Sequence, residues 1–221
     1  MGYGPYLERV AAGHQRRHAS DNREELDRAG HALDMAAAGA RVAVVSGGDP
    51  GVFAMAAAVL EALDRDEEGR WEDVAVTVHP GVSAMQAAAA RLGAPLGADF
   101  CAISLSDNLK PLEVVERRVR LAAEAELVMA LYNPASRARP WQLGQVLAVI
   151  GEVHPPETPV IFATAAGREQ EQLTVTTLGE ADAAQADMRT LVLVGIPATR
   201  VLRRPDGSPR VYTPRYYDGA E

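Results

Sequence analysis

The sequence predicts a two-domain α/β protein, because short apolar runs of strand length alternate with longer amphipathic stretches of helical spacing. The chain has 221 residues, of which 48% are hydrophobic, and this is enough to bury one large core or two smaller ones. The order strand, helix, strand favours parallel pairing in the sheet. Strands are expected at residues 41–45, 74–78, 100–104, 127–132, 160–163 and 190–195.

Helix starts are marked by capping residues or by proline. Ser20 precedes a stretch whose apolar spacing ends at Gly39, and Ser83 precedes another. Pro111 and Pro140 each stand at a first-turn position, where proline is well tolerated. We expect helices over residues 26–38, 50–63, 83–92, 111–125 and 140–150.

Glycine and proline are concentrated in residues 91–99, between a predicted helix and the next strand. We place the joint between two domains near Gly97. The prediction is an N-terminal domain over residues 1–97 with a parallel sheet and helices, and a C-terminal domain over residues 98–221 with a mixed sheet.

Two segments of the C-terminal half extend this prediction. Residues 172–177 alternate apolar and polar side chains, which indicates a half-exposed strand in a more antiparallel part of the sheet. The tail from Arg203 onward is rich in Pro, Gly, Arg and Tyr, and we expect a loosely ordered terminus there.

Composition excludes several classes of function. With 30 acidic and 22 basic residues the net charge is −8, which argues against a surface for nucleic acid or anionic lipid. The single cysteine, Cys101, excludes an internal disulfide and a multi-cysteine metal site. His14 and His18 lack a third ligand nearby, so no metal is expected. The apolar runs are too short to cross a membrane, no signal-peptide pattern is present, and we expect a cytoplasmic protein.

Ser46-Gly-Gly-Asp-Pro-Gly-Val-Phe53 follows a predicted strand and precedes a helix, where α/β proteins place ligand-binding loops. The phosphate-loop pattern is absent, and Asp49 would repel a phosphate but would suit hydroxyl, ammonium or sulfonium groups. A plain tight turn without a ligand remains the alternative. Segments 80–84 and 131–134 follow two other strands in the same way, so the three turns are expected to converge on one crevice.

These loops resemble the motifs of the tetrapyrrole methylases. The resemblance rests on Gly-Asp-Pro-Gly, Gly-Val-Ser-Ala, Ile103-Ser-Leu-Ser-Asp107, Leu131-Tyr-Asn-Pro134 and Gly167-Arg-Glu169, in the family's order and spacing. Within the family, the Ser-Leu-Ser-Asp motif and Tyr132-Asn-Pro-Ala-Ser-Arg137 are similar to the methyltransferases that act on carbon 17 of a corrin precursor. The resemblance implies S-adenosylmethionine as cofactor and methylation of precorrin-3B with ring contraction to precorrin-4, in cobalamin biosynthesis.

The resemblance also implies site residues. A dry pocket that aligns methyl donor and acceptor needs few catalytic side chains, and Asp107, Tyr132 and Ser106 are the candidates for proton movement. Arg137, Arg168 and Asn133 are the expected substrate contacts, because guanidinium groups bind carboxylates well; surface pairing of Arg168 with a neighbouring glutamate is the alternative. The cofactor contacts carried over from the family are Gly48, Asp49, Val52, Phe53, Ser83, Ala84, Leu131 and Thr190.

The chain departs from the family in two places. Members normally open with a strand and a Gly-x-Gly-Pro-Gly loop, whereas Met1-Gly-Tyr matches a later point, so we expect that strand and loop to be missing. Thr164-Ala165 stands where relatives more often carry Arg-Asn. A homodimer is implied by the resemblance. A methylase acting at another tetrapyrrole position and a truncated, non-catalytic binding protein are the competing interpretations.

Overall fold

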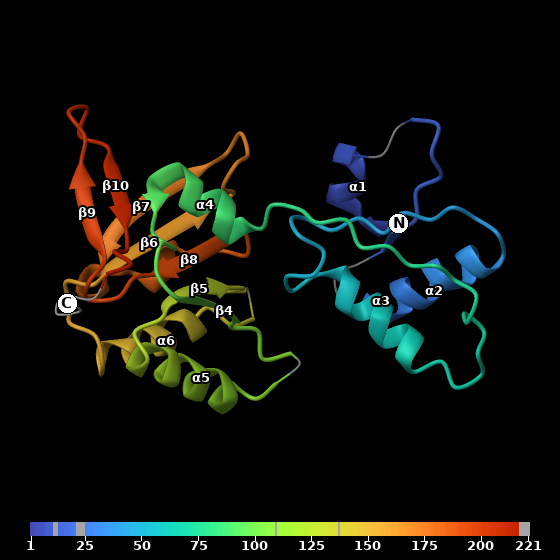
Figure 1. Ribbon diagram of the computed structural model, residues 1–221, viewed down its shortest axis with the longest axis horizontal. Coiled ribbons are helices and arrows are strands. Elements are labelled where there is room, and N and C mark those ends of the chain that lie inside the picture. The colour runs from blue at the N-terminus through green and yellow to red at the C-terminus, as the bar shows by residue number, and fades with distance from the viewer. Residues whose placement is uncertain (11–12, 21–24, 109, 137, 217–221) are drawn as a thin grey trace. The chain divides into compact units, whose positions relative to one another are not determined.

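The computed structural model describes residues 1–10, 13–20, 25–108, 110–136 and 138–216, and its contacts divide the chain into two compact units. The first unit ends at Ser83 and the second begins at Ala84 (Figure 1). This division falls earlier than the joint predicted near Gly97. The physical reason is that helix α4 (Ala84–Leu92) and strand β3 (Gly93–Ala94) pack on strands of the second unit.

In the first unit, helices α2 (Glu25–Ala37) and α3 (Met55–Asp64) pack against each other around a small apolar core. Trp71 closes this core, and its indole N–H donates to the Asp34 carboxylate at 2.8 Å, so the ring is buried without an unpaired donor. The elements of this unit are β1 (Gly2–Tyr3), α1 (Gly4–Val10), β2 (Ala19–Ser20), α2 (Glu25–Ala37) and α3 (Met55–Asp64).

The strands predicted at 41–45 and 74–78 are wrong for the described part of the chain. A strand needs a neighbour that accepts and donates its backbone hydrogen bonds. Among the described residues of this unit, the ladder consists of the parallel pair β1 and β2 and a parallel bridge from Gly2 to Val45, beside which Met1 bonds to the backbone of Ala43 and Val45. Val76 and Val78 are 39% and 46% exposed, so this apolar run is not buried as a central strand would be. The predicted N-terminal parallel sheet is therefore reduced to these pairings.

The second unit is built on a mixed five-stranded sheet in the order β4-β5-β8-β6-β7, as predicted for the C-terminal half. Helices α5 and α6 pack on one face, where Met129 and Leu131 point, and α4 packs on the other, where Ala130 points. Successive side chains of this strand point to opposite faces of the sheet and so contribute to two separate apolar cores. The elements are β4 (Phe100–Ser104), α5 (Leu112–Glu124), β5 (Val128–Tyr132), α6 (Gln142–Gly151), β6 (Pro159–Thr164), β7 (Gln172–Thr177) and β8 (Thr190–Val194).

The tail expected to be loose is instead partly a hairpin. Strands β9 (Arg200–Arg203) and β10 (Pro209–Tyr212) pair antiparallel, and β10 also pairs in parallel with β3. Val211 is fully buried, and the Thr213 hydroxyl donates to the Pro95 carbonyl at 2.7 Å. These contacts offset the entropy of ordering a Pro- and Gly-rich segment. No helix in the described part of the chain is both long and apolar enough to span a membrane.

Candidate functional site

In the first unit, Asp49 ties two predicted loops together. Its Oδ1 accepts from the Gly51 N–H at 2.8 Å within its own loop, and its Oδ2 accepts from the Gly81 N–H at 2.9 Å. These two bonds, that from Gly81 foremost, lower the pKa of Asp49 below its ordinary value. The carboxylate is therefore ionised at neutral pH and links the two loops, and its remaining lone pairs could still accept bonds from a ligand.

Glycine makes this close approach possible. The backbone at Gly48 has a φ of 104°, a conformation that favours glycine, and a Cβ added at Gly81 would lie only 2.8 Å from the Gly48 carbonyl oxygen. A side chain at either position would separate the loops or strain the turn. The segments 46–53 and 80–83 are thus in contact, with Gly47, Gly48 and Gly81 exposed and Ser83 buried.

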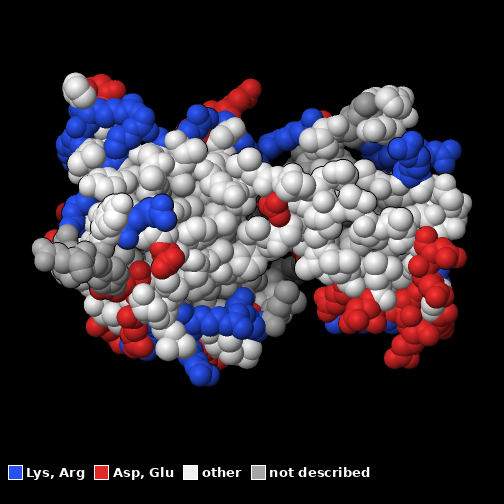
Figure 2. Space-filling view, viewed as in Figure 1, with Lys and Arg blue, Asp and Glu red and all other residues white. Residues whose placement is uncertain are grey.

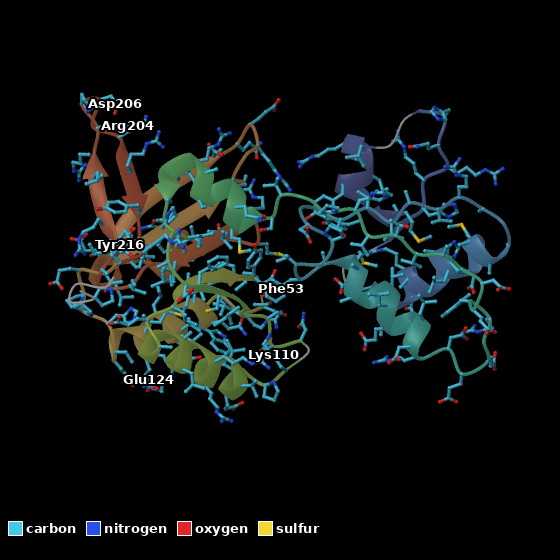
Figure 3. All side chains as sticks on the ribbon, viewed as in Figure 1. Phe53, Lys110, Glu124, Arg204, Asp206 and Tyr216 are labelled. Carbon is cyan, nitrogen blue, oxygen red and sulfur yellow. The ribbon has the colours of Figure 1, made fainter. Side chains whose placement is uncertain are left out.

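The rest of the first loop is fixed at both ends. The Ser46 hydroxyl accepts from the Met55 N–H at 3.2 Å, which satisfies a donor at the start of α3. A Cβ on Gly47 would meet the ring of Tyr6 at 2.5 Å, so the loop passes directly against this ring. Phe53 has a φ of 50° and is 52% exposed (Figure 3). An exposed aromatic ring on strained backbone is a candidate ligand contact.

In the second unit, the topology brings the other motifs to one edge of the sheet. Strands β4 and β5 are parallel, and β8 runs antiparallel to both β5 and β6. The carboxyl ends of β4, β5 and β6 and the start of β8 therefore lie at the same edge, with Ser104 opposite Tyr132 and Thr164 opposite Thr190. Open α/β sheets bind ligands outside such strand ends.

Ser104 is a residue of this edge that the sequence analysis missed. Its hydroxyl accepts from the Asn133 side-chain amide at 3.0 Å and from the Ser106 N–H at 3.4 Å. Asn133 is held at a φ of 52°, and the bond to Ser104 fixes its amide in that strained turn. Its place at the end of an apolar strand and inside the Ile103-Ser-Leu-Ser-Asp107 motif was the available signal. Ser104 is thus a positioning residue for the predicted substrate contact Asn133.

Tyr132 has a defined partner at the same edge. Its hydroxyl accepts from the Met85 N–H at 3.2 Å, a donor in the first turn of α4 that has no partner within the helix. The neighbouring Leu131 is fully buried against α5 and α6, so only its backbone can meet a ligand. The loop 131–134 is thereby anchored on both faces of the sheet.

Thr190, itself buried, takes part in a small hydrogen-bond network at this edge. Its hydroxyl lies 2.8 Å from the Thr164 hydroxyl and 2.9 Å from Asp187 Oδ1, and it accepts from the Asp187 N–H at 3.0 Å. Thr164 occupies the position where the sequence departs from the family pattern, and here its side chain is the partner of Thr190. Next to it, Ala165 has a φ of 51°, which turns the chain sharply into the Gly167-Arg-Glu motif.

The candidate catalytic residues of the loop after β4 are engaged in the protein. Asp107 forms an ion pair with Arg139, with both side chains largely buried. The Ser106 hydroxyl accepts from the Asn108 N–H at 3.4 Å. The charge of Asp107 is thus paired with that of Arg139 within the protein.

Of the two arginines predicted to bind the substrate, the structure describes one. Arg137 lies outside the described residues. Arg168 is exposed in a turn shaped by its N–H, which donates to the Ala165 carbonyl at 3.0 Å. Glu171, a surface partner considered for Arg168, accepts from Arg91 at 3.0 Å and from the Gly167 N–H.

The predicted site residues therefore fall into two groups. Gly48, Asp49, Val52, Phe53 and Ser83 belong to the joined loops of the first unit, and Ala84, Leu131 and Thr190 belong to the second. Within the first unit, two of the three expected turns do come together. The approach of the third turn to them stays a prediction.

Comparison with known proteins decides the family. The model of the tetrapyrrole (corrin/porphyrin) methylases matches residues 3–182, which is most of the chain and spans the loops of both units. This chain belongs to the tetrapyrrole methylases. The methylase is 62% identical over 221 residues to a precorrin-3B C(17)-methyltransferase of Sinorhizobium, an alignment that covers 99% of this chain and 86% of the relative.

Solved structures agree with this assignment. The crystal structure of the methyltransferase CobJ is 50% identical to this methylase and superposes with a TM-score of 0.90, covering 96% of this chain and 87% of that one. A uroporphyrin-III C-methyl transferase from Thermus thermophilus, complexed with S-adenosyl homocysteine, has a TM-score of 0.55 at 22% identity, covering 76% and 69% of the two chains. The latter likeness concerns the fold alone.

Proposed function

We propose that this chain is an S-adenosylmethionine-dependent C-methyltransferase of cobalamin biosynthesis, which methylates precorrin-3B at carbon 17 with contraction of the ring to precorrin-4. The observation that carries the proposal is the 62% identity over 99% of the chain to a protein named for that reaction. The shared fold with CobJ at a TM-score of 0.90 supports it.

The loops of the first unit suit the cofactor. The main chain at Gly47 and Gly48 is exposed, and the glycines there and at Gly81 leave it open to a ligand. Asp49 and Ser46 hold this surface in shape, so polar groups of the cofactor would bond to backbone atoms, with Phe53 as an apolar contact. When bound, S-adenosylmethionine supplies the methyl group on its sulfonium.

The edge of the sheet in the second unit suits the tetrapyrrole. Asn133 is held by Ser104, and the Arg168 turn is fixed by backbone bonds, so both present polar groups from preset positions. Arg168, and Arg137 beside Asn133 in the sequence, would bind carboxylates of the substrate through paired N–H donors. These groups orient the substrate carbon, and the rate then depends chiefly on alignment and exclusion of water.

We also infer that the protein acts as a homodimer in the cytoplasm. The family resemblance motivates the dimer, and the single cysteine fits a reducing compartment. Light scattering after gel filtration at micromolar concentration tests the dimer, because a mass near the 23.5 kDa of one chain contradicts it.

The decisive experiment is turnover of the purified protein with S-adenosylmethionine and precorrin-3B, followed by mass spectrometry and absorbance. We expect the product to gain one methyl group and S-adenosyl homocysteine to form in equal amount. Methylation of another precorrin but not of precorrin-3B would contradict the substrate assignment. Failure to methylate any precorrin, together with no binding of S-adenosyl homocysteine, would contradict the assignment as a methyltransferase.

A further inference from the structure

Tyr6 lies against the main chain of the loop over residues 46–53, a contact to which the proposed function gives no role. A Cβ built on Gly47 would lie 2.5 Å from Tyr6 Cζ, 2.8 Å from its hydroxyl oxygen and 2.9 Å from its Cε1. The hydroxyl end of the ring therefore covers one side of Gly47 so closely that only glycine fits beneath it. Gly47 is nevertheless exposed, so its other side stays accessible to a ligand.

The segment that precedes Tyr6 holds its ring in place. The rings of Tyr3 and Tyr6 meet edge to face, with centroids 5.5 Å apart and an angle of 79° between their planes, which is a favourable aromatic contact. Gly2 forms a parallel bridge to Val45, and the Val45 N–H donates to the Met1 carbonyl at 2.8 Å. The residues that carry the ring and those that lead into the loop are thus bonded to each other.

The contact with Tyr6 restricts the most flexible part of the loop. Ser46 and Asp49 are each tied to a backbone N–H donor, and Gly47 and Gly48 stand between them. Glycine has more backbone freedom than any other residue, and a ligand that binds a free loop must pay for ordering it. The ring of Tyr6 blocks one direction in which this stretch could move, and so lowers that cost.

The stretch that Tyr6 covers is uncharged. No charged residue occurs between Arg41 and Asp49. Figure 2 shows the acidic side chains on the visible face of the first unit gathered near α2 and α3. Tyr6 is half-buried and lies outside the apolar core between these two helices. The ring thus acts on the loop by packing against its main chain.

We propose that Tyr6 is a positioning residue for S-adenosylmethionine: through Gly47 it holds the loop over residues 46–53 in the conformation that binds the cofactor. The proposal rests on the proposed function, which places the cofactor at this loop. Because the ring carbon Cζ makes the shortest of the three approaches, the ring is required and its hydroxyl group is dispensable.

The test is calorimetric titration of S-adenosyl homocysteine into variants at the two positions. Tyr6→Ala and Gly47→Ala should each weaken binding about tenfold, because the first frees the loop and the second pushes it off the ring. Tyr6→Phe keeps Cζ and should bind like wild type. The double variant should bind more tightly than Gly47→Ala, because its new methyl group no longer meets a ring. Tyr216→Ala, which truncates an exposed tyrosine of the second unit, is the matched control and should keep the wild-type affinity.

Unchanged affinity per folded molecule in Tyr6→Ala would overturn the proposal, even with a lower melting temperature, because a merely structural residue alters stability alone. A double variant that binds no better than Gly47→Ala would overturn it as well. Where Tyr6→Ala does not fold, Tyr6→Leu takes its place, since leucine removes the ring but keeps apolar volume.

Turnover separates this proposal from the proposed function. If S-adenosyl homocysteine binds and Tyr6→Ala weakens it, but no precorrin-3B is methylated, the role of Tyr6 stands and the reaction assignment falls. If precorrin-3B is methylated and KM for S-adenosylmethionine is the same in wild type and Tyr6→Ala, the reaction stands and the role of Tyr6 falls.

Discussion

Replacement of Gly81 by alanine tests whether the two loops of the first unit are in direct contact. The new Cβ would lie 2.8 Å from the Gly48 carbonyl oxygen, 3.2 Å from its carbonyl carbon and 3.4 Å from the Asp49 Cα. All three atoms belong to backbone, so no side chain can rotate away and the loops must separate. Overpacking of this kind lowers the free energy of unfolding by about 1–3 kcal/mol.

Gly30→Ala is the matched control, because it adds the same methyl group elsewhere in the first unit. Gly30 lies in α2, and the nearest atom to its added Cβ is Trp71 Cη2 at 3.7 Å, an ordinary contact. Alanine favours a helix over glycine by about 1 kcal/mol, so this variant should be as stable as wild type or more so. The same chemical change is thus expected to act with opposite signs at the two positions.

The assay is urea unfolding together with calorimetric titration of S-adenosyl homocysteine. Gly81→Ala should unfold at lower urea and bind the ligand more weakly, whereas Gly30→Ala should keep the wild-type affinity. Wild-type stability in Gly81→Ala would refute the close contact of the loops. Reduced stability with unchanged affinity per folded molecule would leave the contact in place but remove it from the cofactor site.

Three further predictions concern the polar groups of the two units. Folding lowers the pKa of Asp49, so the ionised carboxylate stabilises the fold at pH values above its unfolded pKa of about 3.9. This stabilisation is lost as the pH falls through the folded pKa. Acidification below about pH 4 should therefore lower the melting temperature of wild type more than that of Asp49→Asn. Tyr132→Phe should lower the free energy of unfolding by about 1–3 kcal/mol in urea titrations, because the Met85 N–H loses its acceptor. Arg168→Lys should raise KM for precorrin-3B in steady-state kinetics while the affinity for S-adenosyl homocysteine stays unchanged.

The strands of the second unit could be predicted from the sequence because burial on both faces leaves a continuous apolar run. Residues 127–132 and 190–195 correspond to β5 and β8, and every residue of β8 is buried. The half-exposed strand over 172–177 was also predicted correctly, since β7 pairs antiparallel with β6 at the border of the sheet. In these strands the hydrophobic pattern of the sequence matches the burial of the side chains in the fold, so the pattern alone was sufficient to predict them.

Strand prediction from apolar runs failed in the first unit, because such a run does not reveal whether another strand lies beside it to form hydrogen bonds. Residues 74–78 have strand composition, yet no described residue completes a ladder with them. The prediction for the C-terminal tail was wrong in the opposite sense, because a strand formed where none was expected. Its proline and glycine residues indicate a loose segment, but β3, more than a hundred residues earlier, supplies a partner for β10. Both errors concern pairing between distant segments, on which single-sequence patterns carry little information.

The motif loops of the candidate site could be located in the sequence, but the partners of their residues could not. The motif loops were found from the family's motifs and from their places after predicted strands, two of which did not form. The bonds of Asp49 to Gly81, of Asn133 to Ser104 and of Tyr132 to Met85, in contrast, span 32, 29 and 47 residues. Such partners follow from the fold. Sequence reasoning assigned Asp49 to the ligand, and it could not foresee that both oxygens also accept backbone bonds; the ligand contact stays a prediction.

These bonds bear on how the proposed reaction would be catalysed. The three candidates for proton movement each have a protein partner: Asp107 has Arg139, Tyr132 has the Met85 N–H, and Ser106 has the Asn108 N–H. A group that is already hydrogen-bonded is held in one position. Methyl transfer from a sulfonium requires alignment of the reacting atoms more than it requires an acid or a base. We infer that these side chains serve the reaction chiefly by keeping the strand ends rigid.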